Sequence, residues 1–163
     1  MLAKRVIPTI LTDGRKLVKG KGVDAWRSVG VAAQAARIHA MRGVDELIIL
    51  DITATNQGRR PDFELIKELT ETIFCPITVG GGVSSIEDID ELLRAGADKV
   101  SICTSTFHTD ILKRASSKFG NQAIVVSIDV KDGRVYSNSG KEKWNLNPVS
   151  YTIDTEADEE YSL

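Results

Sequence analysis

Glycines and small hydroxyl side chains follow two apolar segments of the sequence in a pattern that could bind phosphate. Gly81 and Gly82 come after the segment 77–80, and Thr104 comes directly after Cys103, which ends the segment 99–103. Glycines at the end of a strand let the backbone approach an oxyanion, and the N–H groups that begin the next helix favour negative charge there. Successive glycines also make an ordinary tight turn, so it is the neighbouring hydroxyl cluster that favours a phosphate site.

Charged residues open three of the apolar segments with matching strand parity. Arg5, Glu46 and Lys99 each stand at the amino end of such a segment. Because side chains alternate between the two faces of a strand, these three would point to the same side of a sheet. They could form a ring of opposite charges at its amino edge, or they could simply be solvated charges at strand starts.

The elements that must position these residues alternate between short β-branched runs and longer amphipathic stretches. We expect strands over residues 5–11, 46–51, 77–80, 99–103 and 123–129. We expect helices over residues 31–42, 62–73 and 109–119, and one more that Ser84 or Ser85 caps and that ends near Gly96. A glycine- and lysine-rich loop over residues 13–30 follows the first strand, and a hairpin around Ser139 and Gly140 follows the last. Strands and helices that alternate about every 30 residues predict right-handed βαβ units and a parallel sheet.

The length of the chain limits this sheet. A closed (βα)8 barrel typically needs about 250 residues, whereas the chain has 163. We therefore expect an α/β fold of about four βα units plus a fifth strand, half of a TIM barrel, with an open doubly wound sheet as the alternative. Such a half barrel exposes two strand edges, so two copies could associate as a homodimer.

Charge is distributed unevenly along the chain. The last thirteen residues contain five acidic residues and no basic one. Because the whole chain has a net charge of −2, the preceding 150 residues carry a net charge of +3. We expect residues 1–149 to form one domain and residues 150–163 to form a disordered acidic tail. The net charge of the chain indicates no basic surface of the kind that binds nucleic acids. No apolar run reaches the ~20 residues of a membrane span.

The two cysteines give little indication of redox or metal chemistry. Cys75 and Cys103 are far apart, and their spacing matches neither a CxxC motif nor a zinc site. Two distant thiols fit the reducing environment of the cytoplasm. We expect no metal and no organic cofactor.

The sequence resembles the cyclase subunit family of imidazole glycerol phosphate synthase, a βα barrel of histidine biosynthesis. The segments that carry the resemblance are KRVIP, VDELIILDITAT, PITVGGGVSSIEDIDELLRAGADKVSICTST and AIVVSIDVKDG. They lie between Met1 and Val149 and correspond to the first half of the family's barrel. The resemblance implies a cyclase or lyase that acts on a phosphorylated small-molecule substrate with ammonia from a glutaminase partner.

The resemblance also implies roles for particular residues. The phosphate site would contain four of them, Gly81, Gly82, Cys103 and Thr104. Catalysis would involve Lys19, after the first strand, and Asp129, the acid of the fifth strand.

A second group of residues would handle ammonia at the opposite end of the strands. Arg5, Glu46 and Lys99 match the family's gate, which passes ammonia from a docked glutaminase. Asp98 matches an acid used in docking. The resemblance therefore favours the charged ring over solvated strand-start charges.

Two residues depart from the family's pattern. Leu11 occupies the place of the strand-one aspartate, and a leucine cannot transfer a proton. Cys103 replaces an asparagine of the phosphate site and forms weaker hydrogen bonds. With Pro8, Leu11 is closer to a sister branch that amidinates sugars for surface polysaccharide, because residues 5–19 fit that branch without gaps. The alternative is a catalytically inactive phosphate-binding half barrel that self-associates.

Two further residues lie near the predicted site. Asp51 ends the second strand on the face opposite to Glu46, which favours a capping or structural role over a ligand role. Trp26 lies in the long first loop, where it could anchor the loop or contact a substrate.

Overall fold

Seven strands form the larger of two sheets in this computed structural model, which describes residues 4–20, 26–107 and 110–152. The strands are β1 (Thr9–Asp13), β2 (Lys16–Gly20), β3 (Trp26–Val31), β4 (Leu47–Asp51), β5 (Ile77–Gly80), β6 (Lys99–Ile102) and β7 (Ile124–Val126). Their order in the sheet is β3-β2-β1-β4-β5-β6-β7, so the edges are β3 and β7.

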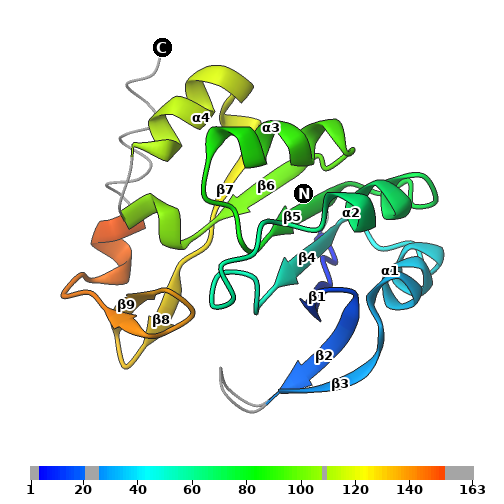
Figure 1. The fold of residues 1–163 in the computed structure, drawn as a ribbon, viewed down its shortest axis with the longest axis horizontal. Helices are drawn as coiled ribbons and strands as arrows, with labels where there is room; N and C mark the ends of the chain where they lie inside the picture. Colours follow the sequence, from blue (N-terminus) through cyan, green and yellow to red (C-terminus); the bar gives the residue numbers. More distant parts are fainter. Residues whose placement is uncertain (1–3, 21–25, 108–109, 153–163) are drawn as a thin grey trace.

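Five of these strands are parallel and lie side by side in chain order. β1 pairs with β4, β4 with β5, β5 with β6 and β6 with β7. The helices between them are α1 (Ala32–Met41), α2 (Phe63–Thr70), α3 (Ile86–Arg94) and α4 (Ile111–Phe119). Right-handed crossovers between strands in sequential order place all the helices on one face, as Figure 1 shows. A doubly wound sheet would reverse its order instead, so the prediction of an α/β fold with a partial TIM barrel is confirmed.

The hydrophobic core lies between the parallel strands and the helices. In β4, Leu47 and Ile49 are buried, whereas Ile48 and Leu50, on the other face, are only half-buried. This alternation shows that one face of the sheet packs on the helices and the other faces the barrel interior. The largest fully buried apolar side chains of the core are Leu47, Leu69, Ile77, Ile89, Leu92, Val100 and Ile102.

The segment predicted as a loop over residues 13–30 contains two strands, so this prediction was wrong. β2 and β3 pair antiparallel, and β2 also pairs with the end of β1, where Thr12 lies opposite Leu17. Residues 21–25 lie outside the described part of the chain. The lysines and glycines obscured the strand pattern because β3 is exposed along its whole length and needs no apolar face.

The predicted fifth strand is shorter than expected. It ends at Val126, and Asp129 begins β8 (Asp129–Lys131) of a small antiparallel sheet, so Asp129 does not end the fifth strand as predicted. The other strands of this sheet are β9 (Arg134–Ser137) and β10 (Glu142–Lys143). Asp132 and Gly133 both have positive φ, as a type I′ turn requires between β8 and β9. The hairpin predicted around Ser139 and Gly140 is confirmed, since it joins β9 to β10.

Stacked aromatic rings attach the small sheet to the end of β6. The Phe107 ring, in the short helix η1 (Thr104–Phe107), lies 4.9 Å from that of Trp144 and 4.8 Å from that of Tyr151. Tyr151 is buried, so residues 150–152 belong to the folded unit and not to the predicted tail. Residues 153–163 lie outside the described residues, and no helix in the described part is long and apolar enough to cross a membrane.

Candidate functional site

A cleft of about 770 Å³ lies at the carboxyl ends of the parallel strands. One wall consists of strand ends of the large sheet, and the other consists of residues of the small sheet. The predicted phosphate and catalytic residues that line it are Gly81, Gly82, Cys103, Thr104 and Asp129, and Leu11, Trp26 and Asp51 line it as well. The structure therefore brings together the four predicted phosphate ligands and one of the two predicted catalytic residues.

Backbone packing requires the two glycines at the end of β5. Gly81 has φ +100°, and a Cβ atom there would lie 2.2 Å from the carbonyl oxygen of Asp51. Gly82 has φ +73°, and its Cβ would lie 2.5 Å from the carbonyl oxygen of Arg59. The glycine pattern that predicted a phosphate site thus has a packing cause of its own, which is independent of any ligand.

The N-terminus of α3 is occupied by an internal carboxylate. Asp88 is buried, and its Oδ2 accepts hydrogen bonds from the N–H groups of Ser84 at 2.9 Å and Ser85 at 3.0 Å. Arg60 Nε donates to its Oδ1 at 2.7 Å. Burial alone would raise the pKa of Asp88, but the hydrogen bonds from Ser84, Arg60 and Ser85 lower it overall. The N–H groups of Ser84 and Ser85, near the helix start where the sequence suggested anion binding, therefore already donate to the carboxylate of Asp88.

The loops after β5 and β6 are joined beside the cleft. The Ser105 hydroxyl donates to the carbonyl oxygen of Val83 at 2.6 Å, next to Gly82. Thr104 Oγ1 accepts a hydrogen bond from the Asn138 N–H at 3.0 Å. The predicted phosphate ligands from two different strands are thereby held next to one another.

Cys103 is a protonated thiol at neutral pH. Burial, with a smaller contribution from the negative charge of Asp129, raises its pKa to about 11. Cys103 is therefore better described as a small filler at the end of a strand than as a reactive thiolate.

The two predicted catalytic residues lie in different places. The Asp129 residue is exposed overall, yet the cleft walls desolvate its carboxyl group, which raises the pKa of Asp129. Lys19 is exposed on β2 and is not among the residues that line the cleft. Leu11 does line the cleft, with an apolar side chain where the resemblance implied that the family has an acid.

Asp51 is a hydrogen-bond acceptor for the loop that follows β4. Its Oδ1 accepts from the N–H groups of Thr53 at 3.0 Å and Ala54 at 3.1 Å, and its Oδ2 accepts from Arg59 Nη1 at 3.1 Å. The predicted capping role is confirmed, and Asp51 also forms part of the cleft wall. Trp26, at the start of β3, lines the cleft as well.

Opposite charges meet at the amino edge of the sheet. Glu46 is buried, and its carboxylate lies 2.6 Å from Arg5 Nη1 and 3.0 Å from Lys99 Nζ. Hydrogen bonds from Lys99 and Arg5 lower the pKa of Glu46. The predicted juxtaposition of these three charges is confirmed. Asp98 is exposed, and its carboxylate accepts a hydrogen bond from the Ile77 N–H at 2.8 Å, which connects the starts of β5 and β6.

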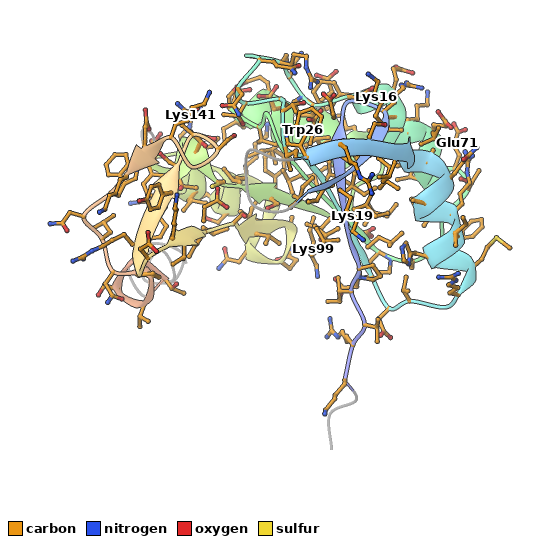
Figure 2. All side chains as sticks on the ribbon, turned by 90° about the horizontal axis from the view of Figure 1, so that it is seen from below. Lys16, Lys19, Trp26, Glu71, Lys99 and Lys141 are labelled. Atoms are coloured by element: carbon orange, nitrogen blue, oxygen red, sulfur yellow. The ribbon has the colours of Figure 1, made fainter. Side chains whose placement is uncertain are left out.

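Sequence reasoning missed the wall that the small sheet contributes. Tyr136, Ser139 and Lys141 line the cleft, but none was predicted as a site residue. The turn signal Ser139-Gly140 did indicate a hairpin, but not which part of the chain it would pack against. Figure 2 shows Lys141 and Trp26 toward the top of the view, with Lys99 of the amino edge below them.

A family model and individual relatives both relate this chain to histidine biosynthesis proteins. The family model described as "Histidine biosynthesis protein" matches residues 5–159. Imidazole glycerol phosphate synthase subunit HisF of Dictyoglomus turgidum is 42% identical over 162 residues, which cover 96% of this chain and 64% of the relative. The subunit of the same name from Dictyoglomus thermophilum is 45% identical over 147 residues, or 90% of this chain and 56% of the relative. That of Dehalococcoides mccartyi is 41% identical over 162 residues, with 96% and 64% covered. The chain thus spans less than two thirds of the length of these relatives.

Proposed function

Since the chain belongs to the histidine biosynthesis protein family, we propose that it is a cyclase-type subunit of the imidazole glycerol phosphate synthase kind. In this proposal it uses ammonia from a glutaminase partner on a phosphorylated substrate. The observation that carries the proposal is the cleft at the carboxyl ends of the strands, where Gly82, Thr104 and Asp129 meet. In parallel βα barrels this is the edge at which ligands bind.

The phosphate group is bound by neutral donors at the strand ends. Gly81 and Gly82 allow close approach of the backbone, and Thr104 contributes a hydroxyl group. Cys103 fills space between them and contributes little hydrogen bonding, because its thiol is protonated.

Asp129 carries the acid–base role. Its raised pKa supports this role, because a carboxyl group works best as a proton donor and acceptor when its pKa moves toward the working pH. Lys19, which is exposed on β2, is the second catalytic residue of the proposal.

Ammonia enters from the opposite edge of the sheet. The cluster of Arg5, Glu46 and Lys99 is the gate, and the glutaminase docks around it with a contribution from Asp98. Support comes from the apolar surface of this edge, where Phe74, just before β5, is 93% exposed and Met41, the last residue of α1, is 87% exposed. Exposed apolar side chains beside charged ones are typical of protein–protein contact surfaces.

Leu11 supports a second candidate, a phosphate-binding protein without turnover. Proton transfer at the end of β1 needs a titratable group, and leucine has none. A third version retains activity but acts in the amidation of polysaccharide sugars, which the gap-free match of residues 5–19 favours. Association of two copies through the strand edges β3 and β7 is a further prediction, which light scattering would test.

The test measures turnover of a phosphorylated substrate by the chain with glutamine plus a glutaminase subunit, and separately with ammonium salts. We expect both nitrogen sources to support turnover, and glutamine to do so only with the partner present. Asp129→Asn should lower kcat by at least about a hundredfold. Asp132→Asn, a change of the same kind in the nearby β8–β9 turn, should leave kcat unchanged. Phosphate binding without turnover from either source would reject the synthase role and favour the second candidate.

A further inference from the structure

The turn between β9 and β10 has an unusual conformation next to the predicted phosphate site. Asn138, Ser139 and Gly140 are successive residues with φ of 52°, 55° and 79°. Asparagine adopts this left-handed region readily, but serine avoids it, so the surrounding structure has to hold Ser139 there. Such strained backbone occurs frequently at ligand-binding sites, which makes this turn a candidate for function.

Contacts on both sides hold the turn in place. On the cleft side, the Asn138 N–H donates to Thr104 Oγ1 at 3.0 Å. On the other side, the buried Ser137 hydroxyl accepts from Trp144 Nε1 at 2.8 Å, and the Trp144 ring stacks on Phe107. Thr104 and Phe107 are the two ends of the same short helix η1, so the turn and the phosphate site are fixed relative to each other.

Lys141 is the residue that this turn presents to the cleft. It lines the cleft together with Ser139 and Gly140, on the wall that the small sheet contributes. Figure 2 labels Lys141 on this part of the ribbon. Its side chain is exposed and forms no ion pair with any residue of the described ranges 4–20, 26–107 and 110–152. Among the acids of the cleft, Asp51 is already paired with Arg59 at 3.1 Å.

The predicted phosphate ligands leave a charge to be balanced. Gly81, Gly82, Thr104 and the thiol of Cys103 are all neutral, whereas the carboxyl groups of Asp51 and Asp129 line the same cleft. A phosphate dianion among neutral donors and acids needs a nearby cation to offset its desolvation and the repulsion. Lysine supplies such a cation as a compact point charge.

We propose that Lys141 is an anion-binding residue of this cleft and that its ammonium group neutralises the phosphate held by Gly82 and Thr104. The left-handed turn, fixed to Thr104, places the lysine beside that phosphate. The inference rests on the phosphate site of the proposed function, and it adds a cationic member that the sequence did not indicate. Lys131 also lines the cleft, but it lies on β8 and not on the turn that is bonded to Thr104.

The test is calorimetric binding of inorganic phosphate to the whole chain at low ionic strength, where charge contributions are least screened. Lys141→Met should weaken binding by about tenfold, as expected for loss of one charged contact. Lys141→Arg should restore most of the affinity. Lys143→Met is the matched control, since it removes the same charge from an exposed position of the same hairpin that does not line the cleft, and it should change affinity by less than about twofold.

Thr104→Val separates the inference from the function on which it rests. If Thr104→Val loses binding but Lys141→Met binds as well as Lys143→Met, the phosphate site stands and the role of Lys141 is overturned. If the unaltered protein does not bind phosphate, both the phosphate site and the role of Lys141 are overturned. A weaker salt dependence of binding in Lys141→Met than in Lys143→Met would support the inference, because one cationic contact has been removed.

Discussion

A Cβ atom on Gly81 would lie 2.2 Å from the carbonyl oxygen of Asp51, so the ends of β4 and β5 can approach one another only with glycine at this position. Gly14 provides a useful contrast. It also has positive φ, at +55°, but no atom lies within 4 Å of the Cβ that it would carry.

Gly81→Ala should therefore cost far more stability than Gly14→Ala. We expect Gly14→Ala to lower the free energy of unfolding by about 1 kcal/mol, because its only cost is holding an alanine in the left-handed conformation. Gly81→Ala adds a backbone clash and should lose more than about 3 kcal/mol. Urea unfolding of the two variants measures the difference, and equal losses would contradict the packing argument.

Asp88 should stabilise the start of α3 at neutral pH and lose this effect in acid. Asp88→Asn should lower the free energy of unfolding by about 1–3 kcal/mol at pH 7, because the buried carboxylate accepts bonds from Ser84, Ser85 and Arg60. Its folded-state pKa lies below the ordinary value of 3.8, so its contribution is fully present above that pH. The contribution is lost as the pH falls through the lowered pKa.

Unfolding curves of Asp88→Asn and the unaltered protein should therefore converge only below pH 3.8. Glu87→Gln is the control, because Glu87 is an exposed acid in the same helical turn. It should cost less than about 1 kcal/mol through the helix dipole alone. Convergence already at pH 6 would show that the carboxylate of Asp88 is not stabilised as we describe.

Cys103 should react slowly with alkylating reagents. Its pKa of about 11 leaves very little thiolate at pH 8, so iodoacetamide should react about a hundredfold more slowly than with an ordinary cysteine. The rate is measured in a Cys75→Ser background, which removes the other thiol. Asp129→Asn should speed the reaction, because the negative charge of Asp129 helps to raise the pKa of Cys103. A rate equal to that of a free thiol would mean that Cys103 is not desolvated.

Lys99 should contribute more to the charged cluster at the amino edge than Arg5 does. The side chain of Lys99 is 33% exposed and that of Arg5 is 67% exposed, so solvent screens the pair between Arg5 and Glu46 more strongly. Lys99→Met should cost about 1–2 kcal/mol of unfolding free energy and Arg5→Met less than about 1 kcal/mol.

The titration of Glu46 reports the same ranking. NMR of its side-chain carboxyl carbon should show a larger rise in pKa in Lys99→Met than in Arg5→Met, since the hydrogen bond from Lys99 is the largest cause of the lowered pKa. In the unaltered protein, the stability due to Glu46 is present above pH 4.5 and is lost as the pH falls through the lower folded-state pKa. A larger rise in the pKa of Glu46 in Arg5→Met than in Lys99→Met would show that Arg5 is the more important partner of Glu46.

The parallel sheet could be predicted from local pattern, whereas the charged cluster also needed the family resemblance. Alternation of side chains along a strand indicated a common side for Arg5, Glu46 and Lys99, and the resemblance then favoured a charged ring over solvated charges. Leu11 is an even number of residues from Arg5, so the same alternation puts both on one face of the strand, and Leu11 does line the cleft.

Other features depended on contacts between residues far apart in the chain. The β2–β3 hairpin forms on the edge of β1, and nothing in its lysine-rich sequence indicates that edge. The fifth strand stops at Val126 because the chain turns into the small sheet, although the apolar pattern continues beyond it.

The sequence alone therefore determined the order of the five parallel strands and the four helices between them, the common side of the charged residues and the strand ends at which a phosphate site could form. The tertiary structure decided which groups are available at that site. Asp88 occupies the N–H groups of Ser84 and Ser85, and Asn138 joins Thr104 across 34 residues of sequence, which brings Lys141 to the cleft. Such pairings depend on how distant segments pack, whereas periodicity records only the neighbours of each residue along the chain.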